Sequence, residues 1–288
     1  MIKITKLTLL VILFACGTAL AQIETPQPSP AGSVSSVVGL TEVSIDYFRP
    51  KVKGRMIFGE GDKYLLPFGQ LWRTGANSGT KLTLSTDAKI AGTDVKAGEY
   101  LILSVPGKDE WTVYIHGKMI GGNMSNFKEE DVVVKTAVKP IALSSPVESM
   151  TFQISDISED NTSANIEFSW SNASWKLPIT VSYQDAVLES IAKNTKVNVG
   201  NYVQAANFYL SINKDLDQAL EWINMYLAEG KNGGQFWHIH TKAKIQAAMG
   251  NKKDAIATAK KSIELAKANE GGDFGYVKRN EDLIASLK

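Results

Sequence analysis

The stretch EYLILSVPGKDEWTVYIH, residues 99–116, decides the fold class of the first half of the chain. On each side of a Pro-Gly-Lys-Asp sequence lies a short run rich in β-branched and aromatic residues, which is typical of a strand. Proline, glycine and aspartate together favour a tight turn. The stretch therefore predicts an antiparallel hairpin between residues 99–105 and 110–116.

Similar runs continue from residue 41 to residue 182, separated by Gly, Pro, Asn, Asp or Ser. The other predicted strands are 41–48, 80–86, 131–138, 148–155, 163–170 and 175–182. Pro178 favours an edge position for the last strand, because proline cannot donate a hydrogen bond to a neighbouring strand. Short strands without helical patterns between them predict an antiparallel β-sandwich or barrel, and we expect a β-sandwich over residues 35–182.

The pattern changes at Tyr183, after which apolar residues recur at helical spacing and proline is absent. The predicted helices are 183–195, 201–213, 215–229, 234–249, 252–269 and 275–287. Ala219 and Ala255 lie in the first turns of two similar helices, each preceded by a short polar turn, and their 36-residue separation (255 − 219) resembles the tetratricopeptide repeat of about 34 residues. We expect an all-α, tetratricopeptide-like domain over residues 183–288. Because it holds fewer than three repeats, we favour packing and assembly, through self-association or a protein partner, over peptide capture.

The N-terminal residues have the features of an export signal. Lys3 and Lys6 precede an apolar run, and Ala19-Leu20-Ala21 matches a small-x-small cleavage site, so residues 1–21 are a predicted signal peptide. The proline-containing residues 22–34 are a predicted flexible leader. We expect an exported protein, periplasmic or secreted. Lipid anchoring through Cys16 is the less favoured alternative, because Phe14 fits a lipoprotein cleavage box poorly.

Charge and composition exclude several classes. Removing residues 1–21 leaves 31 − 2 = 29 basic against 30 acidic residues, a balance that argues against nucleic acid as a partner. The same removal takes away the only cysteine, and with it disulfides and thiol chemistry. The apolar run is shorter than the roughly 20 residues of a transmembrane helix, and no later segment is comparable. No transmembrane segment is therefore expected.

Motifs for nucleophilic, nucleotide or metal chemistry are lacking, so we expect no cofactor and no metal. The sequence holds no G-x-S-x-G motif and no phosphate-binding glycine loop. His238 and His240 lie two positions apart, so on a helix they point about 200° apart and cannot share an ion; we expect one to be packed and the other solvated. His116 ends a strand, where a satisfied hydrogen bond is the favoured interpretation and acid–base chemistry the alternative.

The candidate binding region is YFRPKVKGRMIFGEGDKYLLPFGQLWRTGAN, residues 47–77, which carries a net charge of +4. Its cations Arg49, Lys51, Lys53 and Arg55 alternate, so an extended backbone would project them to one side. Such a stripe could bind a carboxylate, sulfate or phosphate. The alternative is a solvated edge strand whose like charges prevent aggregation.

The second half of this region, from Pro67 to Asn77, combines an aromatic ring, a guanidinium and an amide near turn-forming glycines. Loops of this composition form the walls of binding sites, although they also plug the open end of a sandwich. The predicted ligand is a small anion or a saccharide. The predicted ligand-binding residues are Arg49, Arg55, Trp72, Arg73 and Asn77.

Three stretches together resemble an exported bacterial family catalogued as domain of unknown function 2911: YFRPKVKGRMIFG, LPFGQLWRTGAN and AGEYLILSVPGKDEWTVYI. The resemblance covers about residues 35–180, and it implies export and the same architecture, in which a helical extension often follows; it implies no activity. The positions that recur in the family are Arg49, Pro50, Gly54, Arg55, Phe58, Gly59, Pro67, Gly69, Trp72, Arg73, Gly75, Ala76 and Asn77. Members typically have asparagine where this chain has His116, which weakens any essential catalytic role for that histidine.

We therefore expect a non-enzymatic ligand-binding or assembly module of the cell envelope. The alternative is an extracytoplasmic hydrolase that acts on a glycan or another envelope polymer through carboxylates such as Glu60 or Asp62. A purely structural module is the third hypothesis. Burial of Arg55 and Arg73 in ion pairs with acids of their own domain would argue against ligand binding.

Overall fold

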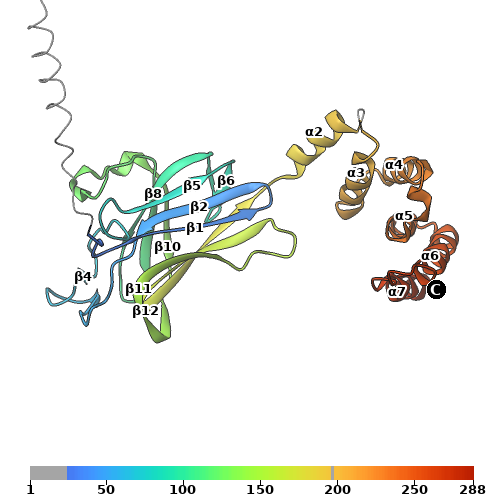
Figure 1. Ribbon diagram of the computed structural model, residues 1–288. Coiled ribbons are helices and arrows are strands. Elements are labelled where there is room, and N and C mark those ends of the chain that lie inside the picture. The colour runs from blue at the N-terminus through green and yellow to red at the C-terminus, as the bar shows by residue number, and fades with distance from the viewer. Residues whose placement is uncertain (1–24, 196–197) are drawn as a thin grey trace, which may run out of the picture. The chain divides into compact units, whose positions relative to one another are not determined.

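The computed structural model describes residues 25–195 and 198–288. The predicted signal peptide and the alternative lipid-attachment residue Cys16 lie outside the described residues. The chain divides into two compact units that meet in sequence between Ser182 and Tyr183. The first unit contains sheets and the second contains helices, as Figure 1 shows.

The larger sheet of the first unit has six strands in the order β1-β2-β5-β8-β9-β10, all antiparallel to their neighbours. Its strands are β1 (Ala31–Val38), β2 (Thr41–Phe48), β5 (Thr80–Leu84), β8 (Gly98–Val105), β9 (Trp111–His116) and β10 (Val132–Val138). The predicted hairpin is confirmed, since β8 pairs with β9 and places Ile102 opposite Ile115. Its turn requires Gly107, because a Cβ there would overlap the carbonyl oxygen of Glu110.

The sheet begins earlier than the sequence predicts. Residues 31–34, assigned to the flexible leader, belong to β1, which pairs with β2 along its whole length. Val34, for example, lies opposite Ile45. The backbone of β2 supplies hydrogen-bond partners to this serine-rich segment, so its composition does not keep it out of the sheet.

The smaller sheet has four strands in the order β11-β12-β6-β7. Its strands are β6 (Ala88–Ile90), β7 (Thr93–Val95), β11 (Ile141–Ser155) and β12 (Ser163–Val181). The separation of the strands predicted at 163–170 and 175–182 is wrong, because residues 163–170 and 175–181 belong to the single 19-residue strand β12. The polar residues between them accompany a shift in the register with β11, where Ser171 adopts a φ of 55°.

Pro178 does not mark an edge strand, because β12 lies between β11 and β6 in the sheet. The pairing of β12 with β11 ends at Ser174, so the missing N–H of Pro178 interrupts no hydrogen bond there. On the other side, the carbonyl of Pro178 accepts a hydrogen bond from the backbone of Ala91 at 2.9 Å. The proline is tolerated because the two neighbours of β12 pair with different parts of it.

Aromatic side chains fill the space between the two sheets and confirm the predicted antiparallel sandwich. Trp111 of β9 contacts Phe168 of β12 with ring centroids 5.7 Å apart, and Tyr47 of β2 contacts Phe152 of β11 at 5.2 Å. Trp111 and Phe168 are fully buried. Burial of such large apolar surfaces is the main contribution to the stability of the fold. A small parallel pair, β3 (Phe58–Gly59) and β4 (Leu66–Pro67), lies in the loop that follows β2.

The second unit contains the six predicted helices, with ends that differ from the prediction by at most two residues. They are α2 (Gln184–Asn194), α3 (Asn201–Ser211), α4 (Leu216–Ala228), α5 (Phe236–Ala248), α6 (Lys252–Lys267) and α7 (Tyr276–Leu287). A short 3₁₀ helix lies at Asn232–Gly234 in this unit, and two more lie at Met124–Asn126 and Glu129–Asp131 in the first unit. Consecutive helices pack on one another, and α5 also contacts α3 and α7. Ala219 and Ala255 are fully buried at these contacts. Across the described residues, every helix is too short or too polar to cross a bilayer.

Candidate functional site

The basic segment after β2 runs beside β11. The backbone of Val52 donates to Glu148 at 2.8 Å, and Met150 donates to Pro50 at 3.0 Å. Between these two bonds, the backbone of Lys51 forms an isolated antiparallel β-bridge with that of Ser149. The segment is thus paired with the edge of β11. This agrees with the alternative interpretation, in which the segment is a solvated edge strand whose like charges prevent aggregation.

The segment then reverses direction. Lys53 and Gly54 have φ values of 49° and 68°, and the backbone of Arg55 donates to the carbonyl of Val52 at 3.0 Å. Positive φ at both central residues is the signature of a type I′ turn. The predicted stripe of four cations on one side is therefore wrong, because the backbone is not extended through these positions.

Arg49 acts within the sandwich and lies apart from the two other arginines of the predicted site. Its half-buried side chain donates through Nε to the carbonyl of Met150 at 3.0 Å and through Nη2 to Oγ1 of Thr151 at 2.9 Å. Both acceptors lie on β11. The guanidinium therefore connects the end of β2 to the opposite sheet.

Three of the five predicted residues, Arg55, Trp72 and Arg73, line one pocket of about 370 Å³. The pocket is called the arginine pocket below. Its other lining residues are Ser29, Pro50, Leu65, Leu66, Gly75, Ala76 and Trp170. The volume suits a small molecule, and the lining combines apolar side chains with two cations.

Two tryptophans form the aromatic side of the arginine pocket. Trp72 stacks on Trp170 with ring centroids 5.7 Å apart and an interplanar angle of 26°. The indole N–H of Trp72 donates to the carbonyl of Gly75 at 3.1 Å, and its backbone exchanges two hydrogen bonds with Ser104 of β8. These bonds fix the ring before any ligand binds.

The arginines of the pocket retain free hydrogen-bond donors. Arg55 donates through Nε and Nη2 to the carbonyls of Val52 and Lys51. Arg73 donates through Nη1 to the carbonyl of Gly122 at 3.3 Å, and its Nε is buried without a partner among the described residues. Each guanidinium has five N–H donors. Within ranges 25–195 and 198–288 neither arginine forms an ion pair, so the arrangement that would argue against binding is not found.

The remaining predicted groups lie elsewhere. Asn77 is exposed, adopts a φ of 51°, and donates its amide to Oε1 of Gln27 at 3.5 Å, without lining the arginine pocket. Glu60 and Asp62 are exposed, and neither lines the pocket. The pocket therefore does not supply the pair of carboxylates that the hydrolase hypothesis requires.

The histidines also lie outside the arginine pocket. His116 is fully buried, and its ring lies tilted against that of Phe127 with centroids 5.5 Å apart. Its Nδ1 lies 2.9 Å from the carbonyl oxygen of Lys118, whereas Nε2 has no hydrogen-bond partner in the described part of the chain. The expected satisfied hydrogen bond is thus present at one nitrogen only.

His238 and His240 are both half-buried, so the expectation that one is solvated is wrong. Burial lowers the pKa of both imidazoles. His240 Nδ1 bonds Asn280 at 2.8 Å, and the ring of His238 contacts Tyr226. Among the residues that the structure describes, no group of three or more His, Cys, Asp or Glu side chains could hold a metal ion.

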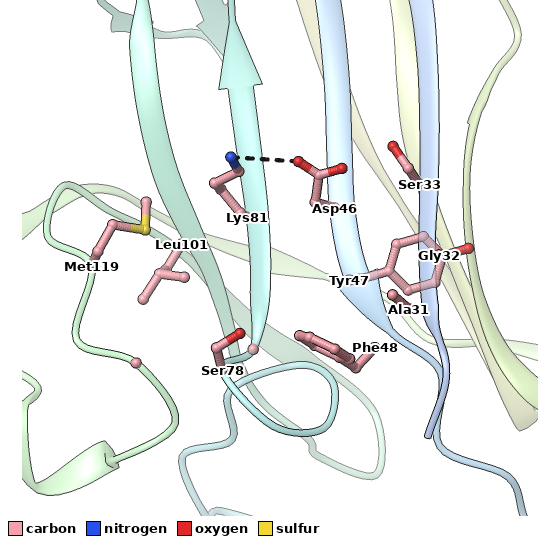
Figure 2. A pocket seen from close by; sticks show the side chains of 12 residues that line it. Ala31, Gly32, Ser33, Asp46, Tyr47, Phe48, Ser78, Lys81, Leu101 and Met119 are labelled. Carbon is pink, nitrogen blue, oxygen red and sulfur yellow. Dashed lines mark ion pairs between the residues drawn. The ribbon is translucent and has the colours of Figure 1, made fainter. Parts of the chain in front are cut away.

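A second pocket, of about 540 Å³, was not anticipated from the sequence (Figure 2). This outer pocket lies on the solvent-facing side of the six-stranded sheet, and Asp46, Phe48, Lys81, Leu101 and Met119 are among its lining residues. The alternation of apolar and polar residues along a strand indicates which side chains point away from the core, but it does not indicate where a pocket forms on that outer face. The available signal was the apolar loop between β9 and β10, which packs against the same face of the sheet and builds one wall of the pocket.

A comparison with protein families finds a match over much of the chain. The model of a family described as "Protein of unknown function (DUF2911)" matches residues 29–179, which is more than half of the 288 residues. The matched range contains the arginine pocket and nearly all of the sandwich. No curated protein and no solved structure shows significant similarity to the chain.

Proposed function

We propose that this chain, which belongs to the DUF2911 family, binds a small anionic ligand in the arginine pocket of its sandwich domain. One observation carries the proposal. Arg55 and Arg73 line the same pocket, and the described residues that line it include no acid. Two cations without an internal counter-charge favour an anion from solution.

Within the chain as the structure describes it, the guanidinium of Arg73 has an unsatisfied donor, which also favours an anionic ligand. A buried N–H without an acceptor is unfavourable, and Arg73 Nε is such a group. Because Arg73 lines the pocket, an oxygen of a carboxylate, phosphate or sulfate bound there would pair with its guanidinium. The apolar side of the pocket, formed by Trp72, Trp170 and Leu65, would accommodate the body of an acidic saccharide.

At the level of the cell, we propose an exported, periplasmic or secreted, non-enzymatic binding or assembly module of the envelope. The predicted signal peptide over residues 1–21 supports export, and the balanced charge supports a specific ligand over a general electrostatic partner. The tetratricopeptide-like spacing supports self-association or a protein partner for the helical unit. The positions of Glu60 and Asp62 outside the pocket favour binding over hydrolysis.

Titration calorimetry with glucuronate, sulfate, phosphate and neutral glucose tests the ligand class. We expect glucuronate to bind more tightly than glucose, with an affinity that falls as salt is added, because salt screens the charged contacts. Arg55→Ala and Arg73→Ala should each weaken binding about 10-fold or more, since hydrogen bonds to charged groups contribute roughly 1.5–3 kcal/mol.

Lys51→Ala is the matched control, because Lys51 is an exposed cation of the same segment that does not line the pocket. Arg73→Lys keeps the charge and loses the planar fork, so its affinity should fall between those of the wild type and Arg73→Ala. Equal affinity for glucose and glucuronate would contradict the proposal. An equal loss of glucuronate affinity in Lys51→Ala and Arg73→Ala would also contradict it.

A further inference from the structure

The outer pocket differs in its chemistry from the arginine pocket. Its apolar surface comes from Phe48 on β2, Leu101 on β8 and Met119 on the loop after β9. Figure 2 shows Met119 and Leu101 on one side of the pocket and Phe48 at its lower end. Met119 is 48% exposed, so the pocket offers an apolar wall that the protein itself does not cover.

The loop that carries Met119 is held in place. Arg73 donates to the carbonyl of Gly122, and a Cβ at Gly122 would overlap the carbonyl oxygen of Asn77. The loop therefore packs closely against the segment around Asn77, and Gly121 of this loop lines the pocket. This wall exists without a ligand, which reduces the ordering that binding would require.

The described charged residues that line the pocket are one acid, Asp46, and one base, Lys81, and together with the neighbouring Glu99 they sum to a charge of −1. Lys81 Nζ lies 2.8 Å from Oε1 of Glu99 and 3.4 Å from Oδ2 of Asp46. The Lys81 ammonium thus contacts two carboxylates. Its shorter contact is with Glu99, which does not line the pocket, and its longer contact is with Asp46, which does. The hydrogen bond that Lys81 donates to Glu99 is the largest cause of the raised pKa of Lys81, so the ammonium stays charged. Asp46 keeps acceptor capacity toward the pocket, because an ionised carboxylate has about four lone-pair sites.

We propose that the outer pocket binds a small molecule with an apolar body and a cationic head, of the alkylammonium class. The head pairs with Asp46, and the body lies against Phe48, Leu101 and Met119. The arginine pocket would hold a ligand of opposite charge, and the two pockets share a neighbour, because Arg73 lines the first and donates to Gly122 in the loop that borders the second. A surface ladder of charges that only stabilises the sheet would make Asp46 matter for stability and leave ligand affinity unaffected.

The test uses octylammonium chloride as the probe, below its micelle concentration, with the full chain labelled at the methionine methyl groups for NMR. We expect the Met119 signal, assigned with Met119→Leu, to shift and saturate. Met56 and Met225 are 46% and 44% exposed and do not line the pocket, so their signals should not move. Octanoate has the same body and the opposite charge, and we expect it to bind at least 10-fold more weakly.

Asp46→Asn should reduce the octylammonium affinity at least 5-fold, whereas Asp46→Glu should retain most of it. Glu42→Gln is the matched control, because Glu42 is an exposed acid of the same strand that does not line the pocket. Three results would overturn the proposal: equal binding of octanoate, full affinity in Asp46→Asn, or shifts of Met56 and Met225 as large as that of Met119.

Discussion

Arg49 and Arg55 are six positions apart in sequence, yet their side chains have different environments. Arg49 is half-buried and donates to Met150 and Thr151 of β11, while Arg55 is exposed and lines the arginine pocket. The turn at Lys53 separates them. At the residue scale, composition predicts that cations gather in this region, but the backbone conformation decides what each one contacts.

Replacing Arg49 with alanine separates the structural role of Arg49 from the proposed ligand-binding role of Arg55. The change removes two hydrogen bonds to β11, and we expect a loss of about 1–3 kcal/mol in the free energy of unfolding, measured by urea titration. Glucuronate affinity should stay within about 2-fold of the wild type. Arg55→Ala should show the reverse pattern, because its side chain is exposed and bonds only to neighbouring backbone. Weakened binding with unchanged stability in Arg49→Ala would contradict this assignment.

At the scale of elements, the sequence predicted best where local patterns and partners agree. β2 was predicted with its exact bounds, and the β8–β9 hairpin was predicted from its turn. The helices were found because their burial follows the periodicity of the sequence. β1 and the middle of β12 were misread because their polar residues satisfy their backbone groups through neighbouring strands, which a single sequence does not display.

The contacts between helices depend on small residues, and Ala255 of α6 tests this. It is fully buried, so Ala255→Leu would insert a larger side chain into a packed contact. We expect a loss of about 1–3 kcal/mol from overpacking, seen in the thermal unfolding of the helical signal at 222 nm. Ala257→Leu is the control on the same helix, since Ala257 is exposed and leucine is a good helix former. Equal effects of the two substitutions would show that Ala255 is not at a tight contact.

Helix α5 should become less stable as the pH falls from 7.5 to 5.5. Burial lowers the pKa of His238 and His240 below the value near 6.5 of an unfolded chain, so the unfolded state binds more protons in this range. Stability therefore falls with decreasing pH. Urea unfolding followed at 222 nm measures the change, and a double His238→Gln, His240→Gln variant should show a smaller slope. Identical slopes for variant and wild type would remove the histidines as the cause.

At the scale of the whole molecule, each unit has a core of its own. The helical unit buries Val203, Ala206, Ala219, Ile223 and Ile245 in one cluster. The sandwich buries its aromatic residues between two sheets. A unit with its own core can fold alone, because the burial that stabilises it does not depend on the rest of the chain.

Separate production of residues 25–182 and 183–288 should therefore give two folded proteins. We expect a β-type circular dichroism spectrum and full glucuronate affinity from the first, and a helical spectrum with cooperative melting from the second. The intact chain should then show two unfolding transitions at the temperatures of the separate parts. A fragment that stays unfolded, or a single transition in the intact chain at a temperature above both, would mean that each unit depends on the other for its stability.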